Sequence, residues 1–400
     1  MANVSSSNGL EKRPKLRFPG FDEPWKETAL SSVLTERNEY AEKDGTYEHA
    51  TLSKEGIYGK TARYDRDFLV STENKKYKVT HLGDLCYNPA NLKFGVICLN
   101  TYGDAIFSPI YVTFEIDASS DPDFIGAYLT RWDFINRALK YQQGTVYERM
   151  AVSPEDFVSI KCCFPQKAEQ TRLAEFITLL DNRIAAQGKY VESLKKYKRG
   201  LLNKVFSNTD GKIYPTVYLS EVADFLQGLT YSPSDVANAG HLVLRSSNIQ
   251  NGTLSFDDCV YVDKSIPESL QVKCADVIMC VRNGSKSLVG KTALIPVDMP
   301  KTTWGAFMMI VRSKLNDTYI FHYLNSQMFF SQVFKDTGTA TINQITKGIL
   351  NECRLPLPPV EERKKISKML STFDAKIYNA ERTLYALMET RKALLQQLFI

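Results

Sequence analysis

The sequence predicts a mixed α/β protein in which two similar globular domains are each followed by a long helix, and the two helices pair as a coiled coil. Three observations predict this fold. The chain repeats itself at a constant shift of 193 positions, both copies of the repeat carry a coiled-coil periodicity, and short β-rich runs with a few helical stretches precede each copy. A length of 400 residues also suits two domains of common size better than one core.

The repeat aligns residues 168–206 with residues 361–399 without a gap. In each copy apolar residues recur at alternating steps of four and three, which is the 3.5-residue period of a coiled coil. A cation interrupts both stripes at the same position, Lys198 and Arg391, and we expect it to fix the register. The alternative is that each stripe packs as an ordinary bundle helix against its own domain. The expected seam consists of Leu173, Ile177, Leu180, Ile184, Val191, Leu194 and Leu201 in the first copy and Ile366, Leu370, Phe373, Ile377, Leu384, Leu387 and Leu394 in the second.

The segments that precede the two helices are weakly alike. Leu82-Gly83-Asp84-Leu85 is echoed by Cys274-Ala275-Asp276-Val277, and β-rich runs alternate with turn residues in both halves. Beyond such anchors the residues diverge, as two readers of different sequences would require. The expected organisation is a tail at 1–24, a first domain at 25–165, a first helix at 166–207, a second domain at 208–356 and a second helix at 357–400.

Composition excludes several classes of protein. Eight cysteines form no CxxC pair and four histidines form no cluster, so we expect no bound metal. The polar N-terminus carries no apolar stretch of signal-peptide or membrane-span length, and we expect a cytoplasmic protein without a membrane partner. The net charge of +5 is modest, so any contact with DNA must come from local patches.

The sequence contains no recognisable catalytic motif. Residues 88–91, NPAN, lack the second proline and the aromatic ring of the loop with which amino-methyltransferases hold a flipped base. Between Gly284 and Gly290-Lys291-Thr292 lie five residues, whereas a Walker A loop needs four. We therefore expect no catalytic residue and no nucleotide site in this chain.

Local polar clusters remain as candidates for recognition. Arginine can bind guanine and asparagine can bind adenine in the major groove, while lysines and tyrosines can contact phosphates and sugars. For each residue the alternative is a solvated loop side chain or a surface ion pair. The candidate DNA-binding residues are Lys60, Arg63, Tyr87 and Lys93 in the first half and Arg245, Asn248, Gln250, Arg282, Asn283, Ser285 and Lys286 in the second.

Four motifs occur in a fixed order within the duplicated frame: residues 15–21 (KLRFPGF) before Trp25, 244–252 (LRSSNIQNG), 276–278 (DVI) ahead of 290–291 (GK), and 355–363 (LPLPPVEER). Together they make the chain resemble the specificity subunit of a type I restriction-modification system over nearly its whole length. The first half departs from the pattern, since it has only Phe164-Pro165-Gln166 in place of the proline run.

This resemblance implies two target-recognition domains that each read half of a bipartite site in double-stranded DNA, held by an antiparallel coiled coil. It implies a non-catalytic subunit that scaffolds two modification (methyltransferase) subunits and the restriction (translocase/nuclease) subunits. S-adenosylmethionine, ATP and Mg would then belong to those partners, and this chain would bind no cofactor.

Two other readings stay open. The chain could be a self-contained DNA methyltransferase or nuclease with unrecognised motifs, in which case the isolated chain would transfer methyl groups or cut DNA. It could also be a coiled-coil clamp that binds only proteins, in which case no sequence-specific DNA binding would appear even with partners. Neither the target sequence nor its spacer length follows from the residues.

Overall fold

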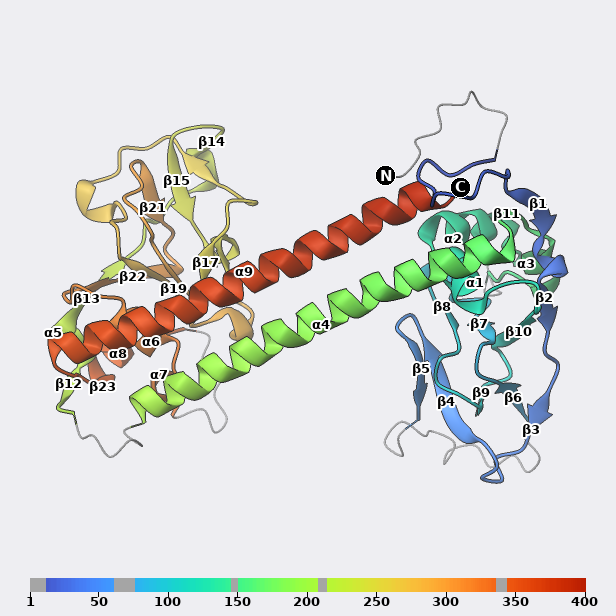
Figure 1. Ribbon diagram of the computed structural model, residues 1–400. Coiled ribbons are helices and arrows are strands. Elements are labelled where there is room, and N and C mark those ends of the chain that lie inside the picture. Colours follow the sequence, from blue (N-terminus) through green and yellow to red (C-terminus); the bar gives the residue numbers. More distant parts are fainter. Residues whose placement is uncertain (1–11, 61–75, 145–149, 208–213, 336–343) are drawn as a thin grey trace. The chain divides into compact units, whose positions relative to one another are not determined.

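The computed structural model describes residues 12–60, 76–144, 150–207, 214–335 and 344–400. The chain forms two compact units: the first comprises residues 1–186 and 384–400, and the second comprises residues 187–383. Each unit combines small sheets with short helices and the ends of two long helices (Figure 1). The mixed α/β class expected from the sequence is thereby confirmed.

The first unit contains a four-stranded sheet of order β2-β10-β7-β8, a five-stranded sheet of order β3-β6-β9-β4-β5, and the pair β1-β11. Asp121 and Ser153 cap two of its short helices by accepting hydrogen bonds from the backbone N–H groups of Phe124 and Asp156. The elements are β1 (Lys26–Ala29), β2 (Leu34–Glu36), β3 (Tyr40–Ala41), β4 (Glu48–Ser53), β5 (Gly56–Gly59), β6 (Tyr77–Thr80), β7 (Leu85–Tyr87), β8 (Ile97–Leu99), β9 (Ala105–Phe107), β10 (Val112–Ile116), α1 (Pro122–Leu129), α2 (Trp132–Ala138), α3 (Pro154–Ser159) and β11 (Lys161–Phe164).

The second unit contains four-stranded sheets of order β13-β22-β19-β20 and β14-β18-β15-β21, with the pairs β12-β23 and β16-β17. Its elements are β12 (Thr216–Tyr218), α5 (Leu219–Val222), β13 (Ala223–Gln227), β14 (Val236–Ala237), β15 (His241–Leu244), β16 (Ile249–Gln250), β17 (Thr253–Leu254), β18 (Tyr261–Val262), β19 (Val277–Cys280), β20 (Thr292–Leu294), β21 (Thr302–Trp304), β22 (Met308–Ser313), α6 (Tyr319–Leu324), α7 (Gln327–Val333), α8 (Lys347–Glu352) and β23 (Arg354–Pro356).

The duplication extends into the sheets. The antiparallel sheet β2-β10-β7-β8 has the same strand order as β13-β22-β19-β20, and both units also pair two strands in parallel, β4 with β9 and β15 with β21. The turn before β7 places Gly83 at φ +89°, and the turn before β19 places Ala275 at φ 66°. A residue in the left-handed backbone conformation therefore occupies the same place in both units, although alanine rarely adopts that conformation.

Two long helices contribute to both units: α4 (Lys167–Phe206) and α9 (Val360–Leu398). In the first unit, Leu173 and Ile177 at the start of α4 lie in the same core as Leu398 and Phe399 at the C-terminal end of the chain. In the second unit, Leu202 and Phe206 at the end of α4 lie in a core with Leu370 of α9. Full burial of an apolar side chain contributes about 1.5–3 kcal/mol, so these contacts anchor the helix ends in both domains.

All fourteen residues of the expected seam are buried or half-buried. Within the second unit, Gln187 Nε2 donates a hydrogen bond to the Ala380 carbonyl (2.9 Å) and Lys198 forms an ion pair with Asp374. Because the later residue of α4 meets the earlier residue of α9, the helices are antiparallel there (Figure 1). In the described part of the chain no helix is both long enough and apolar enough to cross a membrane.

Candidate nucleic-acid interface

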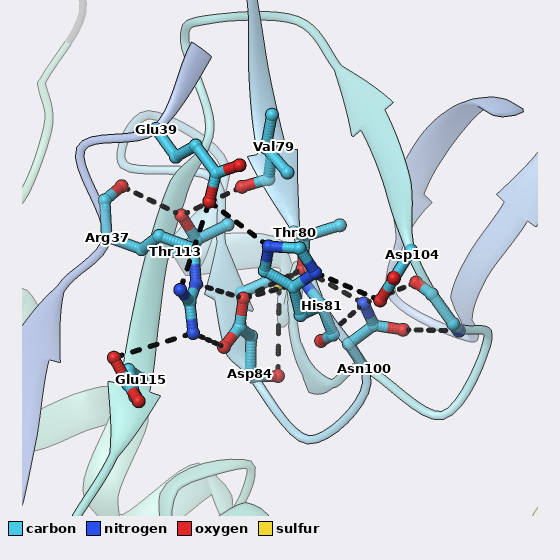
Figure 2. Close-up of polar contacts among 12 residues, drawn as sticks. Arg37, Glu39, Val79, Thr80, His81, Asp84, Asn100, Asp104, Thr113 and Glu115 are labelled. Carbon is cyan, nitrogen blue, oxygen red and sulfur yellow. Dashed lines mark hydrogen bonds and ion pairs between the residues drawn. The ribbon is translucent and has the colours of Figure 1, made fainter. Parts of the chain in front are cut away.

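A partly buried arginine–aspartate pair supports the loops of the first unit (Figure 2). Arg37 follows β2, and its Nε and Nη2 donate to the two carboxylate oxygens of Asp84 at 2.9 and 3.0 Å. Asp84 also accepts a hydrogen bond from the backbone N–H of His81 (2.8 Å), which closes the turn before β7. The hydrogen bond to Asp84 raises the pKa of the Arg37 guanidinium, although burial opposes it. Both charges are thus compensated within the domain.

The second unit repeats this arrangement. Arg312 on β22 donates from Nε and Nη2 to the carboxylate of Asp276 at 2.8 and 2.7 Å, and Asp276 accepts from the Lys273 backbone N–H (2.8 Å). Asp276 occupies the place of Asp84 before the equivalent strand, whereas the arginine comes from a different strand. The repeated pair therefore supports each turn before its central strand and is not free to bind a ligand.

His81 bridges two acidic residues of the first unit, as Figure 2 shows. Its Nε2 lies 3.1 Å from Glu39 Oε2 and its Nδ1 lies 3.0 Å from Asp104 Oδ1. Partial burial lowers the pKa of His81, but the hydrogen bonds to Glu39 and Asp104 outweigh it and the pKa is raised. The imidazole links the segment before β3 to the segment before β9.

The candidate residues of the first half lie in unlike environments. Lys93 is exposed and lies over the Phe94 ring at 5.2 Å, and Lys60 is half-buried with Nζ 3.3 Å from His49 Nε2. Arg63 lies outside the described residues. Tyr87 has 0% exposed surface, and its hydroxyl donates to the Val152 carbonyl (3.0 Å). The expectation that Tyr87 contacts DNA is wrong, because its ring is part of the domain core.

Of the candidate amides in the second half, Asn248 also proves to be structural. Its side chain has 0% exposed surface, donates to the carbonyls of Ser255 and Asp258, and accepts from the Arg245 backbone N–H. Every donor and acceptor of that amide group is directed inward, so the expected contact of Asn248 with a base is wrong. Gln250, on β16, is exposed.

The two candidate loops of the second half are brought together by one contact. Asn283 Nδ2 donates to Ser246 Oγ (3.2 Å), and Asn283 Oδ1 accepts from the Ser285 backbone N–H (2.9 Å). Loop 282–287 therefore lies against loop 245–248, and Asn283 joins them. Arg282, Ser285 and Lys286 are exposed at this junction, while Arg245 forms an ion pair with Asp258 (2.8 Å).

The structure adds aromatic residues that sequence reasoning missed. Phe307, 59% exposed, lies beneath the Arg282 guanidinium, 5.3 Å from ring centre to Cζ. In the first unit, exposed Phe94 and Trp132 line a groove of about 370 Å³. A single aromatic residue in an apolar segment looks like a core residue in the sequence. No local sequence signal distinguishes an exposed aromatic side chain from a buried one.

A serine, a histidine and an aspartate meet in the second unit, but they do not form an active site. His322 Nε2 lies 3.2 Å from Ser371 Oγ, and its Nδ1 lies 3.7 Å from Asp374 Oδ2, too far for a hydrogen bond. His322 has no exposed surface, and Asp374 is paired with Lys198. This cluster joins α6 to α9. Among the described residues no group of three or more potential ligands could hold a metal ion.

The second half of the chain is similar to proteins of a known family. Residues 214–388 match the family model of the type I restriction modification DNA specificity domain. The specificity subunit of the type I restriction enzyme StySPI from Salmonella potsdam is 29% identical over 173 residues, 41% of this chain and 37% of that one. The EcoKI specificity subunit of Escherichia coli K12 is 29% identical over 166 residues, 40% and 36% of the two chains. The match thus spans little more than a third of these relatives.

A further relative, the MjaVIII specificity subunit of Methanocaldococcus jannaschii, is 26% identical over 248 residues, 56% of this chain and 57% of that one. The fold resembles the crystal structure of a type I S subunit from M. genitalium, with a TM-score of 0.62, 16% identity and coverage of 97% of this chain and 99% of that one. A structure from a study of type I R-M complex assembly gives a TM-score of 0.57 at 18% identity, with coverage of 94% and 97%. These matches confirm the resemblance stated from the sequence.

Proposed function

Because residues 214–388 match the family model of the type I restriction modification DNA specificity domain, we propose that the whole chain is the DNA specificity subunit of a type I restriction-modification complex. One observation carries the extension to the whole chain: the first unit repeats the strand order of the second, with an equivalent aspartate turn. A recognition domain that is duplicated in fold but divergent in its loops suits a reader of two different half-sites.

In this proposal the chain recognises DNA and performs no chemistry. The exposed loops would lie in major grooves, where base edges differ between all four base pairs. Helices α4 and α9 join the two readers and supply a surface for two modification subunits and for the restriction subunits. Those partners would bind S-adenosylmethionine, ATP and Mg. The complex would act in the cytoplasm, where the cell's DNA lies.

The test is to co-express the chain with its modification subunits and read all methylated sites in the host genome. We expect methylation at one bipartite sequence with a fixed spacer. Replacing residues 214–354 by the corresponding domain of a related subunit should change one half-site and leave the other unchanged. Methylation by the isolated chain would favour a self-contained methyltransferase, and absence of any sequence-specific binding with partners present would favour a protein clamp.

A further inference from the structure

The arginines of the second unit differ in what their guanidinium groups contact. Residues 214–359 contain four arginines, and among the described residues three have oxygen partners: Arg245 with Asp258, Arg312 with Asp276, and Arg354 with the Tyr218 hydroxyl. The Arg282 side chain is exposed, and its guanidinium has no hydrogen-bond or ion-pair partner within the described part of the chain. Its donors are free for an external acceptor.

The backbone of Arg282 is fixed by two contacts, and its side chain lies over an aromatic ring. The Arg282 backbone N–H donates to the Phe307 carbonyl (3.2 Å), and Arg282 also forms an isolated antiparallel bridge with Gln344. The side chain then lies over the exposed Phe307 ring. Stacking on an aromatic face reduces the entropy that a long side chain loses on binding, and it orients the planar fork of donors. A bidentate acceptor suits this geometry better than a single point charge.

The neighbouring polar residues act differently. The Asn283 amide group forms hydrogen bonds with Ser246 and with the backbone of its own loop, so Asn283 positions Arg282 and does not contact a base. A Cβ at Gly284 would meet no heavy atom within 4 Å beyond its chain neighbours, so the loop is open to a ligand at this position. Exposed Lys286, four residues after Arg282, has a compact charge that suits a phosphate.

We infer that Arg282 is a specificity-determining residue of the second unit, which reads a guanine by donating two hydrogen bonds to its O6 and N7 atoms in the major groove. This inference rests on the proposed function. Among side-chain contacts to base edges, arginine to guanine is the commonest specific one. The half-site read by the second unit must then contain a G·C pair at the position that Arg282 faces.

The experiment uses the full chain in complex with its modification subunits, with the variants Arg282→Ala, Arg282→Lys and Lys286→Ala. Lys314→Ala is the matched control, since it removes one exposed positive charge of the same unit that is already paired with Asp224. Methylated sites are read across the genome, and binding to the wild-type site is measured over a series of salt concentrations. A melting curve of each complex checks that it is folded.

Arg282→Ala should lose discrimination at one G·C position of one half-site, by roughly 5- to 150-fold, and keep the other half-site intact. Arg282→Lys should restore this discrimination at most in part, because lysine lacks the planar fork of donors. Lys286→Ala should weaken binding to all sequences alike and lower the salt slope by about 0.9. Lys314→Ala should change neither the site nor its fidelity.

Three results would overturn the inference while leaving the proposed function standing. The first is a wild-type site retained at full fidelity by both Arg282 variants. The second is a half-site without any G·C pair. The third is uniform weakening by Arg282→Ala that Arg282→Lys restores, since that pattern marks a phosphate contact. Failure of the wild-type complex to methylate any bipartite site would instead overturn the proposed function.

Discussion

Lys198 on α4 and Asp374 on α9 form an ion pair within the second unit. The internal repeat carries these two residues onto Arg391 and Asp181, which pair within the first unit, with Arg391 Nη2 2.9 Å from Asp181 Oδ2. The duplication has therefore preserved a reciprocal charge contact as well as an apolar seam. A shift of one helical turn between the helices would separate both pairs, so the contacts fix a single register.

Lys198→Ala should destabilise the chain by about 1–3 kcal/mol, because it leaves the half-buried Asp374 carboxylate without its charged partner. Burial already raises the pKa of Asp374, and Lys198 is the group that opposes this. The measurement is urea unfolding of the full chain. Lys196→Ala, at an exposed position two residues earlier, serves as the control and should change stability by less than about 0.5 kcal/mol.

A double variant sharpens this test. Lys198→Met together with Asp374→Leu should recover most of the lost stability, because replacing both partners of a poorly hydrated pair by apolar groups leaves no charge unpaired. Equal effects of Lys198→Ala and Lys196→Ala would show that the pair contributes nothing to the fold.

The seam could be predicted from the sequence because a 3.5-residue period depends only on spacing along the chain. The equivalence of Asp84 and Asp276 was visible because the short segments around them, residues 82–85 and 274–277, resemble each other. The roles of Tyr87 and Asn248 were not, since a polar side chain in a loop or strand reads the same whether it points inward or outward. Only the tertiary structure shows that Tyr87 stacks in the core and that Asn248 binds three backbone groups.

The partners of charged residues were equally hidden. Arg245 and Arg282 look alike in the sequence, yet the Arg245 guanidinium pairs with Asp258, whereas the Arg282 guanidinium lies over the Phe307 ring. Such pairings depend on how loops far apart in the chain fold together. The sequence therefore singled out the candidate loops but did not separate the residues that position them from those that are free.

His322 should make stability depend on pH. Burial, with the nearby Lys198 charge, lowers the pKa of His322 to about 3, whereas the unfolded value is near 6.5. The contribution of neutral His322 to stability is complete above pH 6.5 and is lost as pH falls toward 3. In that range the unfolded chain binds a proton on this histidine and the folded chain does not. Between pH 7.5 and 5.0 the free energy of unfolding should fall by about 2 kcal/mol from this residue alone.

The comparison of wild type with His322→Gln isolates this effect. His81, whose pKa is raised, changes stability in the opposite direction, since its contribution is present at low pH and lost as pH rises, and it is common to both proteins. Urea unfolding at the two pH values should show a smaller pH effect in the variant. An identical pH dependence would mean that His322 is not held neutral in the folded chain.

Exposed apolar residues on the long helices should bind the modification subunits. Tyr385 on α9 is 68% exposed, and Leu179 on α4 is equally exposed. Tyr385→Ser should leave stability within about 0.5 kcal/mol but weaken subunit association by at least about 1 kcal/mol. Titration calorimetry with the purified modification subunit measures the free energy of association. Tyr141→Ser, at an exposed position outside the two helices, should leave association unchanged.

Lengthening both helices by one heptad tests whether they set the spacing of the half-sites. The insertions go after Ala186 in α4 and after Thr383 in α9, where each helix passes from one unit into the other. Seven residues keep the seam in phase, and each unit keeps its own ion pair and its own helix ends. Each helix grows by about 10 Å at 1.5 Å per residue.

Since a base pair rises about 3.4 Å, 10 Å corresponds to about three base pairs. We expect the complex to methylate the same two half-sites with a spacer one to three base pairs longer, because no recognition loop has been touched. A heptad inserted in α4 alone is the matched control. With only one helix lengthened, the two ion pairs cannot form in the same register, so assembly should be lower. Genome-wide reading of methylated sites gives the spacer directly. A doubly lengthened, active complex that still modifies only the original spacer would show that the helices dock the partners without measuring the DNA.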